Sequence, residues 1–165
     1  MTYLQQLDDI INTIIAPAAQ TIDRESAFPR AAIHALGDAG LLGLISAEEV
    51  GGMGMGLAEA AQVVERISKV CASTAMVVTM HYCGTTVLEK FGNAAIRRDI
   101  AEGAHLTTLA WSDSGSRSHF WAPVSKARRE GDGIILDGSK SMVTSAAEAD
   151  SYVWSTSPAA AEGAS

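Results

Sequence analysis

Cysteine, clustered basic residues and long apolar runs are all scarce in this sequence of 165 residues. The two cysteines, Cys71 and Cys83, form no C-x-x-C pair and have no histidine at metal-ligand spacing. This excludes a disulfide framework and predicts no metal site, with both thiols reduced and buried. The formal charge is -7, and no run of Lys or Arg offers a track for nucleic acid. No window approaches the ~18 apolar residues of a membrane span.

The start of the chain, MTYLQQLDDI, lacks the basic residues and the apolar run of a signal peptide. Together with the expected free thiols, this predicts a cytoplasmic protein. Hydrophobic residues make up 47% and charged residues 19%, a composition typical of globular domains. A chain of this length buries ~70% of its unfolded surface, so it can form one ordinary domain or two small ones.

The first part of the chain has the periodicity of helices. The apolar stripe over residues 4–15 can pass Pro17 only with a kink, and the helix ends before Pro29. Further helices are expected over residues 29–40, from Leu57 to Lys69, from Cys71 onward, and over 94–101. The helix from Cys71 is apolar on nearly all sides up to Gly84, which places it inside a bundle or against a partner chain.

After Gly103 the pattern changes to that of strands and turns. Strands are expected over residues 105–111, 124–128, 134–136, 141–144 and 152–155. The fold class is therefore α+β, with an all-helical domain over residues 1–104 followed by an antiparallel β domain over 105–165. Four or five strands without a return connection are typical of an incomplete domain, so we expect a fragment.

Two polar segments of the β half carry the clearest chemical signal. Residues 112–118 cluster hydroxyls and backbone N–H donors after a strand, which suits a pyrophosphate or the edge of a carbonyl-rich ring. Met142 and Thr144 would lie on one face of a strand, where one presses on a flat ring and the other bonds its edge. Neither segment alone identifies the ligand.

Two other features favour a structural interpretation. The glycine-rich stretch over residues 51–56 follows the end of a helix rather than a strand and lacks the full G-x-G-x-x-G pattern, so it is interpreted as a connector. His81 lies inside the apolar helix, where a hydrogen-bonded core histidine is favoured over the alternative, a catalytic base.

The order of these segments resembles the N-terminal and middle domains of the acyl-CoA dehydrogenase family of flavoproteins. The similarity lies in G-L-L-G-L-I-x-x-E-x-V-G-G-M-G, then S-D-S-G-S-R-S, then D-G-S-K-S-M-V-T-S-A-A-E-A-D, and covers nearly the whole chain. The family typically has T-E-P-x-x-G-S-D and N-G-x-K-x-W-I-T-N at the last two places. The resemblance implies an FAD-dependent oxidoreductase that removes hydrogen from the α and β carbons of an acyl thioester.

The resemblance also assigns roles to individual residues. It implies a flavin-binding strand and loop from Leu109 through Ala110 and Trp111, with Ser112 at the flavin edge. Ser118 would reach the pyrophosphate and the acyl-CoA substrate. The second motif implies that Met142, Val143 and Thr144 stack on the flavin ring and bond near its reactive nitrogen.

In the family, the catalytic carboxylate comes from a C-terminal helical domain that also completes the flavin site and makes the homo-oligomer. That domain does not correspond to any part of this chain, so the resemblance assigns no catalytic base and predicts weak flavin binding by the chain alone. An electron acceptor, or a flavin reductase, is the implied redox partner.

The departures from the family pattern leave alternatives open. Five residues differ from the typical motif: Asp113 for Glu, Ser114 for Pro, Arg117 for Gly, His119 for Asp and Met142 for Trp. They fit a flavin-dependent monooxygenase of the same fold, which would use FAD or FMN. In that case His81 would become a stronger candidate for a catalytic residue. A third alternative is a non-catalytic interaction domain that uses the apolar helix from Cys71 to Cys83 as its interface.

Overall fold

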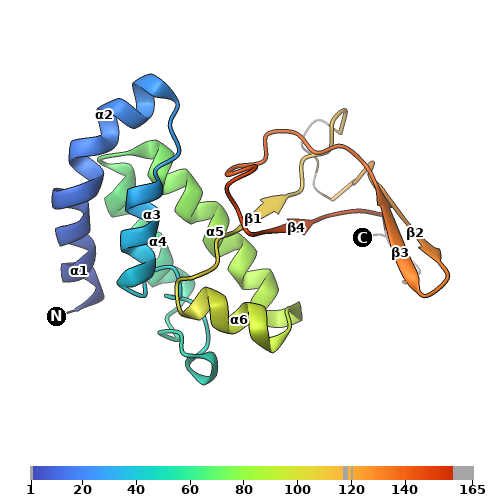
Figure 1. The fold of residues 1–165 in the computed structure, drawn as a ribbon, viewed down its shortest axis with the longest axis horizontal. Coiled ribbons are helices and arrows are strands. Elements are labelled where there is room, and N and C mark those ends of the chain that lie inside the picture. Colours follow the sequence, from blue (N-terminus) through green and yellow to red (C-terminus); the bar gives the residue numbers. More distant parts are fainter. Residues whose placement is uncertain (1, 117–118, 120, 158–165) are drawn as a thin grey trace.

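The computed structural model describes residues 2–116, 119 and 121–157. Helices form one end of the molecule, and the strands extend from them toward the other end (Figure 1). The helices are, in chain order, α1 (Tyr3–Ile10), the π-helix η1 (Ile11–Ile15), α2 (Ala16–Glu25), α3 (Arg30–Asp38), the 3-10 helix η2 (Glu48–Val50), α4 (Leu57–Ser68), α5 (Ala72–Phe91) and α6 (Ala94–Ala101). The strands are β1 (Thr107–Ala110), β2 (Lys126–Glu130), β3 (Gly133–Asp137) and β4 (Ser151–Trp154).

The first helix passes Pro17 by way of the π-helix. Proline has no N–H, and its ring clashes with the carbonyl group four residues earlier in an α-helix. In η1 the N–H of Ala16 donates to the carbonyl oxygen of Ile11, five residues back. The expected kink therefore takes the form of a π-turn. Helix α2 then continues to Glu25 and ends before Ser26, which has a left-handed φ of 52°.

Helix α5 lies at the centre of the helical part and contacts α3, α4, α6, β1 and β4 (Figure 1). Its apolar composition predicted this position. The neighbouring elements do not cover the whole apolar surface of the helix: Met76 is 51% exposed. Cys71 is buried, whereas Cys83 lies on the exposed face, so the prediction of two buried thiols is wrong for Cys83.

The hydrophobic core joins the helices to the connecting segments. The most deeply buried side chains, each at most 1% exposed, include Leu7 of α1, Leu36 of α3, Ile67 of α4 and Leu44 of the segment between α3 and η2. The glycine-rich segment forms the connector that its sequence predicts, and the N–H of Met53 donates to the carbonyl oxygen of Gly43. None of the helices in the described part of the chain combines the length and apolar character needed to cross a membrane.

The strands form two ladders of two strands each. The pairing of β2 with β3 is antiparallel, as expected, whereas β1 pairs with β4 in parallel. About forty residues separate β1 from β4, which is enough chain for the crossover that parallel pairing needs. The strand expected over 141–144 is wrong, because Met142 has a φ of 53° and an extended chain cannot continue through that conformation.

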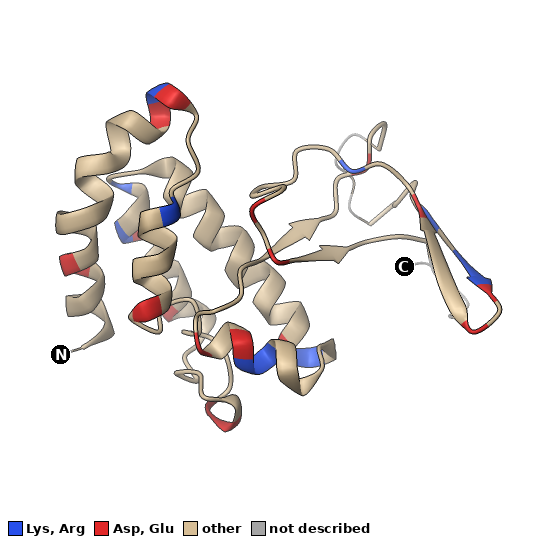
Figure 2. Ribbon diagram, viewed as in Figure 1, with Lys and Arg blue, Asp and Glu red and all other residues tan. Residues whose placement is uncertain are grey.

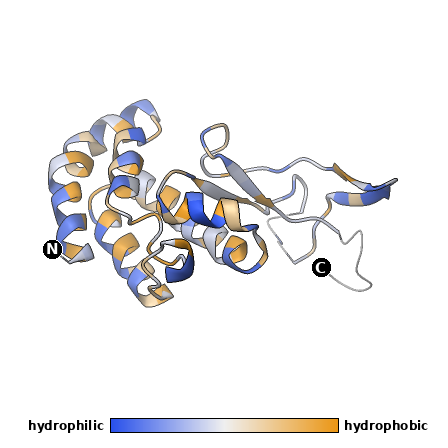
Figure 3. Ribbon diagram, turned by 60° about the horizontal axis from the view of Figure 1, so that its bottom comes forward, coloured by the Kyte–Doolittle hydropathy of each residue, from blue (hydrophilic) through white to orange (hydrophobic). Residues whose placement is uncertain are grey.

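The β2–β3 hairpin projects away from the helices (Figure 1). All residues of β3 are exposed, including Ile134 at 54%, Ile135 at 41% and Leu136 at 54%. Figure 3 shows this apolar strand beside the hydrophilic β2. Within the described residues, no strand pairs with the outer edge of β3.

Replacement of Gly43 by alanine tests the packing of α6 on the preceding segments. The new Cβ would lie 2.3 Å from the carbonyl oxygen of Ala101, a backbone atom that cannot rotate away. We expect Gly43→Ala to lower the free energy of unfolding by about 1–3 kcal/mol in chemical denaturation. Gly133→Ala is the control, since its Cβ would meet an atom only at 3.6 Å, and an equal loss in both variants would contradict the expectation.

Candidate functional site

The two polar segments singled out in the sequence lie side by side. The N–H of Ser141 donates to the carbonyl oxygen of Ser112 at 2.8 Å, and the N–H of Ser114 donates to that of Ser139 at 2.9 Å. On the other side of the second segment, the Thr108 hydroxyl donates to the carbonyl oxygen of Thr144 at 2.8 Å. Backbone and side-chain hydrogen bonds therefore hold both segments against the end of β1.

The first segment places its candidate residues along and just beyond β1. Leu109 and Ala110 belong to the strand, and Trp111 and Ser112 follow it directly. Ala110 is 1% exposed, so the strand end is anchored in the interior. Ser118 lies outside the described residues, and its role stays a prediction.

The second segment is a turn rather than a strand. Met142, Ser145 and Ala147 all have left-handed φ values, of 53°, 59° and 66°. Such conformations are unfavourable for residues other than glycine and gather at functional sites. The Met142 side chain is 91% exposed, so it does not share a buried face with Thr144.

A cavity of about 630 Å³ opens beside this turn. Val143 and Ser145 line it from the turn, and residues of α2, the α2–α3 connection and α5 line it from the helical side. The Ser145 hydroxyl is buried and has no hydrogen-bond partner among the described residues. Since buried hydroxyls in native proteins are nearly always bonded, this atom fits a site for a polar ligand group.

A buried ion pair joins the two segments. Asp113 Oδ1 lies 2.9 Å from Lys140 Nζ, and both side chains are 2% exposed. The other carboxylate oxygen accepts the N–H of Val124 at 2.8 Å, and the Ser125 hydroxyl donates to Oδ1. Burial acts to raise the pKa of Asp113, but the bonds from Ser125 and Lys140 outweigh it and hold the pKa at about 2. The carboxylate is therefore charged throughout the neutral pH range.

Sequence reasoning missed the role of this pair. A lysine in a D-G-S-K turn is expected to be exposed, because charged side chains are almost never buried unless paired. The available signal was the charge of Asp113 in one segment and Lys140 in the other. Their pairing becomes visible only once the two segments are known to be adjacent.

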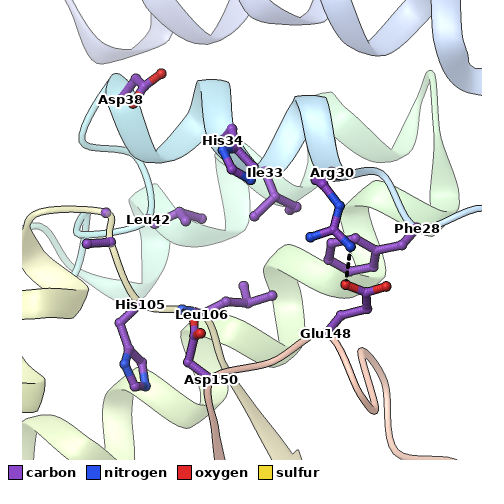
Figure 4. A pocket seen from close by; sticks show the side chains of 12 residues that line it. Phe28, Arg30, Ile33, His34, Asp38, Leu42, His105, Leu106, Glu148 and Asp150 are labelled. Atoms are coloured by element: carbon purple, nitrogen blue, oxygen red, sulfur yellow. Dashed lines mark hydrogen bonds and ion pairs between the residues drawn. The ribbon is translucent and has the colours of Figure 1, made fainter.

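A second, polar cavity of about 370 Å³ lies between α3, the residues before β1 and the residues before β4 (Figure 4). Arg30 of α3 forms an ion pair with Glu148 across it, and Asp150 accepts the N–H of Leu106 at 2.8 Å. His105 bonds the Ser151 hydroxyl at 2.7 Å. These contacts connect the helical part to the chain that follows the turn.

His81 is fully buried, and both of its ring nitrogens meet backbone groups. Nε2 lies 3.0 Å from the carbonyl oxygen of Leu42, and Nδ1 accepts the N–H of Thr107 at 3.2 Å. The neutral ring with its proton on Nε2 satisfies both bonds. Burial lowers the pKa of His81 to about 4, against the opposing effect of the bond to Leu42. This environment is that of a histidine that joins α5 to β1.

Among the described residues, the other charged groups are distributed over several elements. Figure 2 shows Lys and Arg on several separate elements, and neighbouring basic residues lie along β2. In the part of the chain that the structure describes, no three His, Cys, Asp or Glu residues form a cluster that could hold a metal ion.

A model of the acyl-CoA dehydrogenase N-terminal domain matches residues 2–104, well over half of the chain. The chain belongs to the acyl-CoA dehydrogenase family. The resemblance drawn from the motifs is confirmed, as is the helical domain followed by incomplete sheets. The division of the chain at residue 104 stays a prediction.

Similar proteins extend the acyl-CoA dehydrogenase match beyond the helices. A mitochondrial short-chain specific acyl-CoA dehydrogenase from Homo sapiens is 32% identical over 91% of this chain and 38% of its own length. Butyryl-CoA dehydrogenase from Megasphaera elsdenii superposes with a TM-score of 0.84 at 22% identity, covering 98% of this chain and 44% of that one. FMN-bound TdsC from Paenibacillus superposes with a TM-score of 0.81 at 19% identity, covering 98% and 41%. The chain thus spans less than half the length of these proteins.

The buried imidazole gives this acyl-CoA dehydrogenase family member a specific pH dependence. The unfolded chain binds a proton at His81 near pH 6.5, whereas the folded chain does so only near pH 4. The contribution of His81 to the free energy of unfolding is therefore fully present above pH 6.5. It is lost as the pH falls toward 4, by on the order of 3 kcal/mol at the lower end. Chemical denaturation from pH 7 to pH 4 should show this loss in the wild type and not in His81→Gln.

The exposed His34 provides the control. We expect His34→Gln to keep the wild-type slope of unfolding free energy against pH. If His81→Gln and the wild type have the same slope, the assignment of the buried neutral ring is wrong.

Proposed function

We propose that this chain is the N-terminal part of an FAD-dependent oxidoreductase of the acyl-CoA dehydrogenase type. The observation that carries the proposal is the hydrogen-bonded contact between two segments, in which Ser112 and Ser114 after β1 bond Ser141 and Ser139, and Thr108 of β1 bonds Thr144. The family's two flavin motifs fall on these two segments. The proposed reaction is α,β-dehydrogenation of an acyl thioester, followed by transfer of electrons to an acceptor in the cytoplasm.

The residues present offer suitable groups for the flavin. The hydroxyls of Ser112 and Thr144 are proposed to donate to the edge of the ring, and Val143 to provide an apolar contact. Ser118 is proposed to reach the pyrophosphate and the thioester. FAD, when bound, would accept the hydride from the substrate, and these donors would stabilise the negative charge that develops.

The buried hydroxyl of Ser145 supports a ligand at this place. Ser145 lines the cavity that Val143 also lines, and none of the described residues bonds its buried hydroxyl. A polar atom of the cofactor or substrate would satisfy it. We assign no catalytic base within this chain, because His81 is fully buried and both of its nitrogens are engaged by backbone.

The full-length gene product tests the proposal directly. We expect it to be yellow, with the visible absorbance of an oxidised flavin that bleaches on addition of an acyl-CoA substrate. Thr144→Val should weaken FAD binding about 5- to 10-fold through the loss of one hydrogen bond. Thr13→Val is the control, since Thr13 lies in η1 and its hydroxyl bonds only Asp9 among the described residues. A colourless wild-type protein that does not bind added FAD would refute the proposal.

A flavin-dependent monooxygenase is the second candidate. It is favoured by Met142, which replaces the family's Trp and turns outward with 91% exposure, so the usual aromatic cover over the ring is missing. The fold similarity to FMN-bound TdsC shows that the same architecture occurs with FMN in another protein.

Rapid mixing with oxygen separates the two candidates. A monooxygenase should show a transient absorbance, distinct from both the reduced and the oxidised flavin, before reoxidation is complete. A dehydrogenase should instead react slowly with oxygen and rapidly with an artificial electron acceptor. Bleaching by acyl-CoA without any transient would exclude the monooxygenase.

A further inference from the structure

The Asp113–Lys140 ion pair connects four separate segments of the β part. Asp113 lies directly after Ser112, and Lys140 lies two residues before Met142. Lys140 Nζ also donates to the carbonyl oxygen of Ser155 at 2.6 Å and to its hydroxyl at 3.1 Å, just after β4. Asp113 in turn holds the chain at Val124, just before β2.

Every polar atom of the pair is satisfied. The three protons of the Lys140 ammonium group have three acceptors, one on Asp113 and two on Ser155. The ammonium group also lies 5.1 Å from the centre of the Trp154 ring. All three N–H donors of Lys140 are therefore engaged within the protein, and its positive charge neutralises the Asp113 carboxylate.

Stability alone is a weak explanation for such a pair. Desolvation of two charges largely cancels their attraction, and well-packed apolar residues often stabilise a protein equally well. A buried pair does, however, define one relative position of its two segments, because any other position leaves an unpaired charge inside the protein. The two segments here are those proposed to contact the flavin.

We propose that Asp113 and Lys140 are positioning residues for the flavin site, an inference that rests on the proposed function. Their ion pair fixes the distance between the Ser112 hydroxyl and the Met142–Thr144 turn. Flavin affinity therefore depends on a pair of side chains that do not themselves contact the cofactor.

The test uses the full-length protein with Lys140→Met and with the neutral double variant Asp113→Asn/Lys140→Met. FAD binding to the apoprotein is measured by titration, thermal unfolding by calorimetry, and local opening by hydrogen exchange of the amides over residues 112–116 and 139–144. Lys69→Met is the matched control, because it breaks an exposed lysine–carboxylate pair, with Glu65, at a similar distance of 2.8 Å.

We expect Lys140→Met to raise the FAD dissociation constant by about 10- to 100-fold, by analogy with the loss of metal affinity when residues that orient the ligands of a metal site are removed. Amide exchange should accelerate in the two segments and stay unchanged in α1 and α4. The double variant should regain thermal stability, because it has no unpaired buried charge, yet keep the weakened FAD binding. Lys69→Met should match the wild type.

Recovery of stability without recovery of affinity distinguishes positioning from a purely structural role. If the double variant binds FAD as tightly as the wild type, the inference is wrong. If Lys140→Met fails to fold, the double variant alone decides by the same measure. A wild-type protein that binds no FAD refutes the proposed function instead, so the two failures are separable.

Discussion

The arrangement of strands relative to helices depends on one buried imidazole. His81 of α5 bonds the carbonyl oxygen of Leu42 on one side and the N–H of Thr107, the first residue of β1, on the other. Gly84, one turn further along α5, lets Thr107 approach so closely that a Cβ there would lie 2.8 Å from its methyl group. The start of β1 is thereby fixed to the central helix.

Further contacts extend from this point along β1 toward the candidate site. Parallel pairing with β4 continues along β1 as far as Ala110, and the Thr108 hydroxyl bonds the carbonyl oxygen of Thr144 in the turn. Beyond the strand, the Asp113–Lys140 pair ties the two polar segments to the end of β4. The Arg30–Glu148 ion pair provides a second link between the helices and the turn. The helical core and the candidate flavin site therefore form one connected network.

The sequence pattern predicted those structural features that depend on residues close together in the chain. The apolar character of α5 indicated its central position, and Pro17 indicated an irregular helix turn at the place where η1 occurs. The motif order identified the family and the two segments of the candidate site. Local patterns failed where distant contacts decide the conformation. Alternating residues around Met142 resemble a strand, but the bonds from Thr108 and Ser141 hold a left-handed turn there. Likewise, no local signal marks Lys140 as buried, since its carboxylate partner lies 27 positions earlier in the chain.

The exposed strand β3 has a consequence for how this chain behaves at high concentration. Ile134, Ile135 and Leu136 are exposed, and within the described residues no strand pairs with the outer edge of β3. Such an apolar edge is a template on which a second extended chain can add through backbone hydrogen bonds. Self-association through β3 would therefore rise with protein concentration, independently of how firmly the helical core is packed.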